Sequence, residues 1–197
     1  MAPIRTELPE TARPLYPASW GTIETATVGF GQGISVSPLS FVAAAASIVN
    51  GGRRITPTFV KQDGADRRGE QVLKPRTSEQ MRDLLRYVVT DGTGKKADVI
   101  GYDVGGKTGS AQVPGEHGRY IPHALRTSFC AVFPVHDPRY IVFVILDQPH
   151  GTKETGGFAL AGYTAAPMAG KVIARIAPLL GVPNVPPPPT KVADGSS

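Results

Sequence analysis

Cysteine and long apolar runs are both scarce in this chain of 197 residues, whose one cysteine is Cys130. A single cysteine excludes a framework of intrachain disulfides. Because it lies in the apolar run Phe129–Phe133, we expect a buried and unreactive thiol. The longest apolar stretches, around Phe41–Val49 and Tyr140–Leu146, are far shorter than the roughly 20 residues that span a bilayer. The sequence therefore predicts a soluble chain without a signal peptide or transmembrane segment.

Motifs for binding nucleic acid or metal are missing as well. The formal net charge is +5, but the basic residues come as isolated pairs such as Arg53-Arg54 and Lys95-Lys96, without interleaved aromatic residues. The histidines do not have the spacing of metal ligands. We therefore expect no nucleic-acid partner, no metal and no cofactor, and a solvated basic surface with mild attraction for a carboxylate-rich polymer. The four histidines are His117, His123, His136 and His150.

Acidic residues do not form the pairs that acid–base catalysis uses. Glu24, Asp147 and Glu154 stand apart from one another in the sequence, so capping or solvated roles are the better interpretation. Trp20 is predicted to anchor the N-terminal segment in the core.

Helix signals occur at three places between two proline-rich ends. Residues 1–20 contain four prolines and predict an extended arm, and 183–197 predict a disordered tail. Ser37 followed by Pro38 begins a helix that stops at Asn50. Ser78 is expected to cap a second helix over Glu79–Val89, and a final amphipathic helix is expected over Pro167–Leu180.

Strand signals follow the second helix. Three runs, Tyr102–Val113, Ala124–Val135 and Tyr140–Asp147, have strand composition, and the four residues His136–Arg139 between the last two allow a hairpin turn. We expect an α+β fold in which a three-stranded antiparallel meander is packed by helices. A single domain would then occupy residues 21–182.

The sequence around Lys107 carries the most informative motif, Gly106-Lys107-Thr108-Gly109-Ser110. Lys-Thr-Gly in a strand is one third of the active site of serine acyl enzymes; the other thirds are Ser-x-x-Lys and a Ser-x-Asn or Ser-Asp-Asn triplet. No lysine of this chain has Ser three residues before it, and no asparagine has Ser two residues before it. The chain therefore has one wall of such a site and lacks the nucleophile.

A phosphate loop is the rival interpretation of the same residues. Gly101 to Thr108 matches Gly-x-x-x-x-Gly-Lys-Thr, and Ile141–Leu146 followed by Asp147 imitates the strand and aspartate that hold magnesium in such proteins. That function requires a helix beginning at the Lys-Thr. Gly109, Pro114 and the glycines that follow Lys107 argue against a helix there.

Several blocks follow one another in order along the chain. They are Trp20 to Thr27, Phe30 to Gly33, Val36 to Leu39, Gly106 to Gln112, Gly118 to Tyr120, Ser128-Phe129 and Asp137 to Tyr140. These blocks resemble the class B penicillin-binding proteins, and are most similar to the division-specific septal transpeptidases of Gram-negative bacteria. The resemblance covers about Leu8 to Val182. It implies part of a penicillin-binding-protein or β-lactamase-like transpeptidase fold, in particular the second half of that catalytic domain.

This resemblance implies roles for four residues. Lys107 would place a positive charge near the terminal carboxylate of the substrate, and Thr108 would offer that carboxylate a hydroxyl. Gly109 would leave room for the substrate. Ser110 stands where most relatives have Thr, and its hydroxyl would help to bind the carboxylate. Its backbone N–H would be a donor of an oxyanion hole. The catalytic residues of this chain would then be Lys107 and Ser110.

Strand geometry supports these roles independently. Alternation puts Thr108 and Ser110 on one face and Lys107 on the other, so Lys107 reaches a ligand only around a sheet edge. The strand should therefore be an edge strand, able to bind an extended peptide by strand addition. The alternative is a surface lysine that protects an edge from pairing.

The function implied by the resemblance is that of a peptidoglycan D,D-transpeptidase, which cross-links stem peptides by serine acyl transfer during division and binds β-lactams. The ligand would be a stem peptide ending in D-Ala-D-Ala, with division proteins as partners, at the periplasmic face of the inner membrane. We expect this chain to be a C-terminal piece of such an enzyme and inactive alone. The alternatives are a non-enzymatic binding module of the same fold and the phosphate-loop nucleotide binder.

The resemblance also implies a five-stranded sheet, in which two further strands pair beside Tyr140–Leu146. This run has no Lys, Pro or bulge signal to protect it. We therefore expect self-association through its edge, exchange of segments with a second copy, or pairing with the N-terminal arm.

Overall fold

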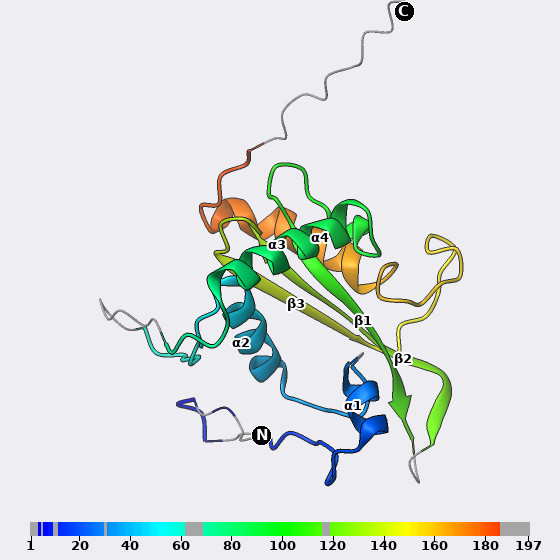
Figure 1. Ribbon diagram of the computed structural model, residues 1–197. Coiled ribbons are helices and arrows are strands. Elements are labelled where there is room, and N and C mark those ends of the chain that lie inside the picture. Colours follow the sequence, from blue (N-terminus) through cyan, green and yellow to red (C-terminus); the bar gives the residue numbers. More distant parts are fainter. Residues whose placement is uncertain are drawn as a thin grey trace, which may run out of the picture.

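The computed structural model describes residues 4, 6–9, 12–29, 31–61, 69–115 and 119–185 (Figure 1). Phe30, His117 and Gly118, and the tail beyond residue 185, lie outside the described residues. The elements in the described part are α1 Thr22–Gly29, α2 Pro38–Val49, α3 Pro75–Thr90, the 3-10 turn η1 Lys95–Ala97, β1 Gly105–Pro114, β2 Tyr120–Phe133, β3 Tyr140–Asp147 and α4 Ala165–Leu179.

The three strands form one antiparallel sheet in the order β1-β2-β3. Lys107 lies opposite Cys130 in the β1–β2 ladder, and Phe129 lies opposite Val144 in the β2–β3 ladder. The expected α+β meander is confirmed, and β3 has the predicted bounds. β1 begins three residues later than expected. β2 begins four residues earlier, because its pairing with β1 resumes at Tyr120, opposite Pro114, after a shift in register.

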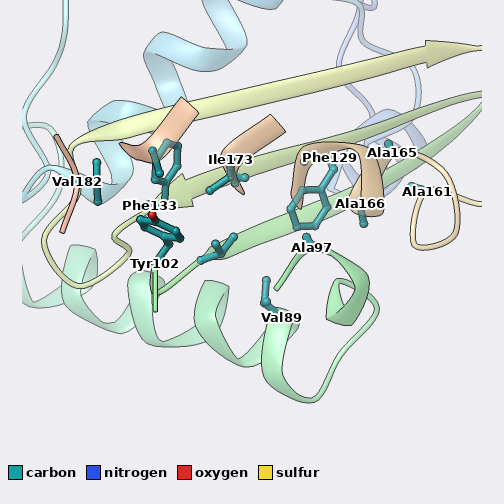
Figure 2. Packing of buried hydrophobic residues seen from close by; sticks show 14 residues of the cluster. Val89, Ala97, Tyr102, Phe129, Phe133, Ala161, Ala165, Ala166, Ile173 and Val182 are labelled. Atoms are coloured by element: carbon teal, nitrogen blue, oxygen red, sulfur yellow. The ribbon is translucent and has the colours of Figure 1, made fainter. Parts of the chain in front are cut away.

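Two apolar clusters hold helices to opposite faces of the sheet. Phe129 and Phe133, both fully buried, point toward α4, where Ile173 is also fully buried (Figure 2). Their neighbour Val132 points to the other face and packs with Val49 of α2. This alternation along β2 explains why both faces of the strand are apolar.

α2 begins and ends where the sequence predicts. The hydroxyl of Ser37 accepts a hydrogen bond from the N–H of Ser40, Pro38 occupies the first turn, and Asn50 follows the last residue. Such a cap satisfies one of the N–H groups that a helix leaves free at its start.

The predicted start of α3 is wrong by four residues. The helix begins at Pro75, and Ser78 lies inside its first turn, fully buried, where its hydroxyl accepts a hydrogen bond from the N–H of Gly51. Proline is well suited to the first helical position because it has no N–H to satisfy. Ser78 thus fixes the end of α2 against α3 rather than capping its own helix.

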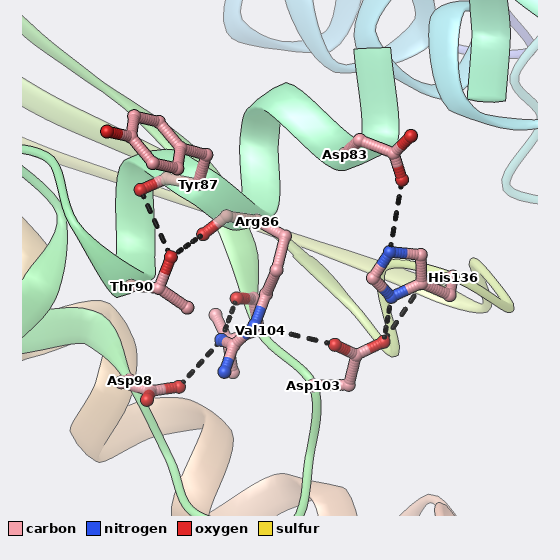
Figure 3. A network of polar contacts seen from close by, with 8 residues as sticks. All are labelled: Asp83, Arg86, Tyr87, Thr90, Asp98, Asp103, Val104 and His136. Atoms are coloured by element: carbon pink, nitrogen blue, oxygen red, sulfur yellow. Dashed lines mark hydrogen bonds and ion pairs between the residues drawn. The ribbon is translucent and has the colours of Figure 1, made fainter. Parts of the chain in front are cut away.

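A polar network fixes α3 to the start of β1 (Figure 3). The Arg86 guanidinium donates to the carbonyl of Val104 at 2.7 Å and to the Asp98 carboxylate at 2.8 Å, and its Nε lies 3.6 Å from Asp103. The His136 ring lies between Asp103, at 2.9 Å, and Asp83, at 3.3 Å. The strand that carries the Lys-Thr-Gly motif is therefore positioned from its first residues.

The described residues before α1 contain no helix, and Leu15 pairs with Ser35 rather than with β3. Trp20 is 54% exposed, so the prediction that it anchors this segment in the core is wrong. Glu24 accepts a hydrogen bond from the N–H of Gly21 at the start of α1, a capping role as predicted. Among the described residues, no helix is long and apolar enough to cross a membrane.

Candidate active site

β1 carries all four predicted site residues at the edge of the sheet. Within the described residues β1 pairs with β2 alone, so its other side is open, as predicted for an edge strand. Directly opposite residues of a ladder share a face. Thr108 and Ser110 therefore share the α4 face with Phe129 and Thr127, while Lys107 and Gly109 face the other way.

The ladder also fixes the direction of the backbone groups. The N–H of Gln148 donates to the carbonyl of Leu125, its direct partner, at 2.8 Å. Hydrogen-bonded and non-hydrogen-bonded pairs alternate along an antiparallel ladder, so odd-numbered residues of β2 bond to β3 and even-numbered ones to β1. By the same alternation, the N–H and C=O groups of Gly106, Thr108 and Ser110 point away from β2 into the open edge.

The side chain of Lys107 reaches around this open edge of β1. This side chain is exposed, and its ammonium donates a hydrogen bond to the carbonyl of Thr108 at 2.7 Å. That carbonyl is one of the outward-pointing groups, so the Lys107 side chain lies around the edge rather than flat on its own face. A positive charge and an outward N–H at Ser110 therefore lie along the same open stretch of backbone.

A cavity of about 400 Å³ lies beside Thr108 and Ser110 on the α4 face. The hydroxyls of Thr108 and Thr93 are 2.8 Å apart, and the Ser110 hydroxyl accepts a hydrogen bond from the N–H of Ala161 at 3.1 Å. Lys95 and Lys96 complete the polar wall. Hydroxyls together with lysine ammonium groups suit an anionic ligand such as a carboxylate.

Sequence reasoning missed Thr93, Lys95 and Lys96 as site residues. The ammonium of Lys96 lies 4.4 Å from the centre of the Tyr163 ring, which orients it beside the cavity. The turn Gly92-Thr93-Gly94 before the two lysines could have indicated their place at the site, because such a turn allows the chain to reverse from α3 toward β1.

A larger cavity lies elsewhere. It has a volume of about 830 Å³ and is lined by residues from the segments around Tyr16 and Gly33 and by Gln112, Phe143 and Ile145, among others, without Lys107, Thr108 or Ser110. The smaller cavity is lined by Thr108 and Ser110 of the motif, and we therefore regard it as part of the site.

None of the remaining titratable candidates Cys130, Asp147 and Glu154 lines this cavity. Burial raises the pKa of Cys130 to about 12, in keeping with the predicted inert thiol. Asp147 forms an ion pair with Arg126 at 2.9 Å, and Glu154 is exposed. The described residues contain no group of three or more metal ligands.

The phosphate-loop interpretation is wrong. Lys107 and Thr108 lie in the middle of β1, whereas a phosphate loop needs them at the start of a helix, where the N–H groups of the first turn face the phosphate. No such turn follows Thr108.

Comparison with known proteins agrees with this geometry. The family model described as the penicillin binding protein transpeptidase domain matches residues 3–171. The chain belongs to the penicillin-binding protein transpeptidase family. The resemblance seen in the sequence is thereby confirmed.

Relatives of this family member include a probable peptidoglycan D,D-transpeptidase and a sporulation protein. The probable peptidoglycan D,D-transpeptidase FtsI of Caulobacter vibrioides is 41% identical over 189 residues, which cover 91% of this chain and 32% of the relative. Stage V sporulation protein D of Bacillus subtilis is 40% identical over 173 residues, which cover 82% of this chain and 26% of that protein. The chain thus spans about a third or less of the length of these relatives.

Solved structures of the family have the same fold. The TP domain of Burkholderia pseudomallei penicillin-binding protein 3 superposes with a TM-score of 0.81 at 32% identity, covering 93% of this chain and 55% of that domain. Penicillin-binding protein 3 of Mycobacterium tuberculosis, solved in complex with ampicillin, superposes with a TM-score of 0.78 at 28% identity. The match covers 93% of this chain and 44% of that protein.

Proposed function

We propose that this chain forms the substrate-binding wall of a peptidoglycan D,D-transpeptidase that acts in cell division. The observation that carries the proposal is the open edge of β1, where the Lys107 ammonium binds the outward-pointing carbonyl of Thr108 and a cavity lined by Thr108 and Ser110 adjoins the strand. An open strand edge binds an extended peptide through its backbone, and a positive charge at the edge selects a peptide that ends in a carboxylate.

In this proposal the terminal carboxylate of a D-Ala-D-Ala stem peptide lies against Lys107 and the hydroxyls of Thr108 and Ser110. The backbone N–H of Ser110 is one donor of the oxyanion hole that stabilises the tetrahedral intermediate. Gly109 has no side chain where the peptide passes. Lys95 and Lys96 add positive charge at the far side of the same cavity.

Acyl transfer also requires a serine that this chain does not provide. No Ser-x-x-Lys or Ser-x-Asn triplet occurs in the 197 residues. In the complete reaction a serine hydroxyl attacks the carbonyl of the penultimate D-Ala, the terminal D-Ala leaves, and an amine of a second stem peptide accepts the acyl group. We therefore propose that the nucleophile comes from polypeptide outside these residues and that the chain alone is inactive.

The proposed partners follow from the relatives. β-Lactams would bind at the same edge, since penicillin-binding protein 3 of Mycobacterium tuberculosis has been solved with ampicillin and with aztreonam. Division proteins would be further partners, and the site would work at the periplasmic face of the inner membrane. The outer edge of β3 would be a separate surface, for association with a second copy of the chain.

Intact-mass spectrometry after incubation with a fluorescent penicillin tests the acyl-transfer part. We expect no adduct on the isolated chain, because no activated serine is present. A stable adduct on any serine would show that a nucleophile exists here and would contradict the assignment.

A further inference from the structure

The two hydroxyl groups that β1 contributes to the cavity already have hydrogen-bond partners in the protein. The hydroxyls of Thr108 and Thr93 are 2.8 Å apart, and the Ser110 hydroxyl accepts a hydrogen bond from the N–H of Ala161 at 3.1 Å. Both partners lie outside the strand: Thr93 is in the turn between α3 and η1, and Ala161 is in the turn before α4. These partners decide which hydrogen bonds the two hydroxyls can still offer to a ligand.

The Ser110 hydroxyl is set up as a donor. Ala161 is 1% exposed, so its backbone N–H needs an acceptor inside the protein, and the Ser110 hydroxyl is that acceptor. A serine hydroxyl has one proton and two lone pairs, and the bond from Ala161 uses a lone pair and leaves the proton free. Accepting a hydrogen bond also polarises a hydroxyl and makes its proton a better donor.

The same reasoning gives the direction of the hydrogen bond between Thr93 and Thr108. Each of these hydroxyls has a single proton, so the one that accepts keeps its proton for another partner. An ionised carboxylate offers acceptors only. When a carboxylate binds the Thr108 hydroxyl, the Thr108 proton goes to the ligand, and Thr93 is then the donor to Thr108.

Close packing fixes the turn that carries Thr93. The N–H of Gly94 donates to the carbonyl of Val88 at 2.9 Å and so ties this turn to the end of α3. A Cβ atom at Gly94 would lie 3.1 Å from the ring of Phe129, and a Cβ atom at Gly162 would lie 2.6 Å from the carbonyl oxygen of Thr93. The turn is therefore held between the core and the segment before α4, and its hydroxyl is in place before a ligand binds.

Other polar side chains of the cavity are donors as well. Lys95 and Lys96 line it, and an ammonium group donates three hydrogen bonds and accepts none. A carboxylate can accept at both of its oxygens, whereas a carboxamide has an NH₂ group that gains nothing from facing a donor. Hydroxyls with their protons directed at the ligand would therefore favour a carboxylate over a carboxamide of the same shape.

We propose that Thr93 is a positioning residue that sets the specificity of this cavity. Its hydroxyl donates to Thr108 and directs the Thr108 proton at the ligand, so that a peptide ending in a carboxylate is selected over the same peptide ending in a carboxamide. This inference rests on the proposed function, because the ligand is the terminal carboxylate of a peptide bound along β1. It adds a residue from outside the Lys-Thr-Gly strand, which acts on the ligand only through Thr108.

Amide NMR titrations with N-acyl-D-Ala-D-Ala and with its C-terminal amide measure this selection. Thr93→Val keeps the shape of the side chain and removes the hydroxyl. We expect this variant to bind the acid about fivefold more weakly than the wild type does, as for the loss of one hydrogen bond. The amide should bind no more weakly, because a lone pair of Thr108 is then free to accept from its NH₂ group. Thr93→Ser should restore the wild-type ratio of the two affinities.

Thr90→Val is the matched control, since it makes the same change at the end of α3 and Thr90 does not line the cavity. It should leave both affinities unchanged. Thr93 is exposed, so Thr93→Val should remain folded, which circular dichroism checks, and Thr93→Ala should cause the same loss of selection.

Three outcomes would overturn the role of Thr93 and leave the proposed function standing. They are an unchanged ratio of affinities in Thr93→Val, an equal weakening of both peptides, which indicates a purely structural role, and a Thr93→Ser variant that binds as Thr93→Val does. A wild-type chain that binds neither peptide would overturn the proposed function and this inference together.

Discussion

Gly106 and Gly109 are two glycines of β1 that we expect to respond differently to the same substitution. A Cβ atom at position 106 would lie 2.6 Å from the carbonyl oxygen of Cys130 and 2.6 Å from the ring of Phe129, which is fully buried. Neither the ladder backbone nor the buried ring can move away without disturbing the core. A Cβ atom at position 109 would lie 2.6 Å from the Ser128 hydroxyl alone, and that hydroxyl can rotate away.

Gly106→Ala should therefore lower the free energy of unfolding by about 2 kcal/mol, in the range found for overpacked cores. For a domain of this size that change corresponds to a decrease in melting temperature of about 4 to 8 °C. Gly109→Ala should change the free energy of unfolding by no more than about 0.5 kcal/mol, as surface substitutions usually do. It should nevertheless weaken peptide binding, because the added methyl group lies on the Lys107 face of the strand along which the peptide is proposed to pass.

Thermal melts by circular dichroism, with the two variants compared side by side, measure the difference in stability. A Gly106→Ala variant that melts at the wild-type temperature would refute the packing argument. So would a Gly109→Ala variant that is destabilised as much as Gly106→Ala.

Three further predictions concern the core and the network beside β1. Arg86→Lys should lower the free energy of unfolding by about 2 kcal/mol, because hydrogen bonds to charged groups contribute about 1.5 to 3 kcal/mol. Lysine lacks the fork geometry with which arginine bonds both Val104 and Asp98. An unchanged midpoint of urea unfolding would contradict this prediction. Cys130, with its pKa raised to about 12 by burial, should resist alkylation at pH 8 in the folded chain and react on unfolding. The pKa of this thiol is higher in the folded chain than in the unfolded chain, so its contribution to the free energy of unfolding is complete below pH 9 and falls as the pH rises from 9 toward 12. Cys130→Ala should remove this component from the pH dependence of urea unfolding.

Local signals in the sequence predicted the elements whose ends depend on local chemistry. Ser37, Pro38 and Asn50 mark α2 because capping involves residues within a few positions of one another. The apolar run of β3 gives its bounds because the turn before it contains proline and charged residues. The edge position of β1 followed from requiring Lys107 to reach around the strand.

Tertiary contacts decided the features that sequence reasoning missed. Ser78 has the composition of a cap, but its hydroxyl is used by Gly51, a residue 27 positions away. Thr93 becomes a site residue only because the turn after α3 brings it to Thr108. Trp20 was expected in the core because tryptophan is mostly buried, yet its segment lies on the surface. None of these contacts leaves a periodic pattern in the sequence.

The measurement that tests the central claim most directly is an amide NMR titration of the isolated chain with an N-acyl-D-Ala-D-Ala peptide, followed by intact-mass analysis of the same sample. We predict shifts at the outward amides of Thr108 and Ser110, an unchanged mass, and about tenfold weaker binding for Lys107→Ala, which equals about 1.4 kcal/mol for one charge-assisted contact. Lys153→Ala, which removes a charge from an exposed loop, should bind as the wild type does. No shifts at β1, or binding that Lys107→Ala leaves intact, would contradict the assignment of this edge as the substrate-binding wall.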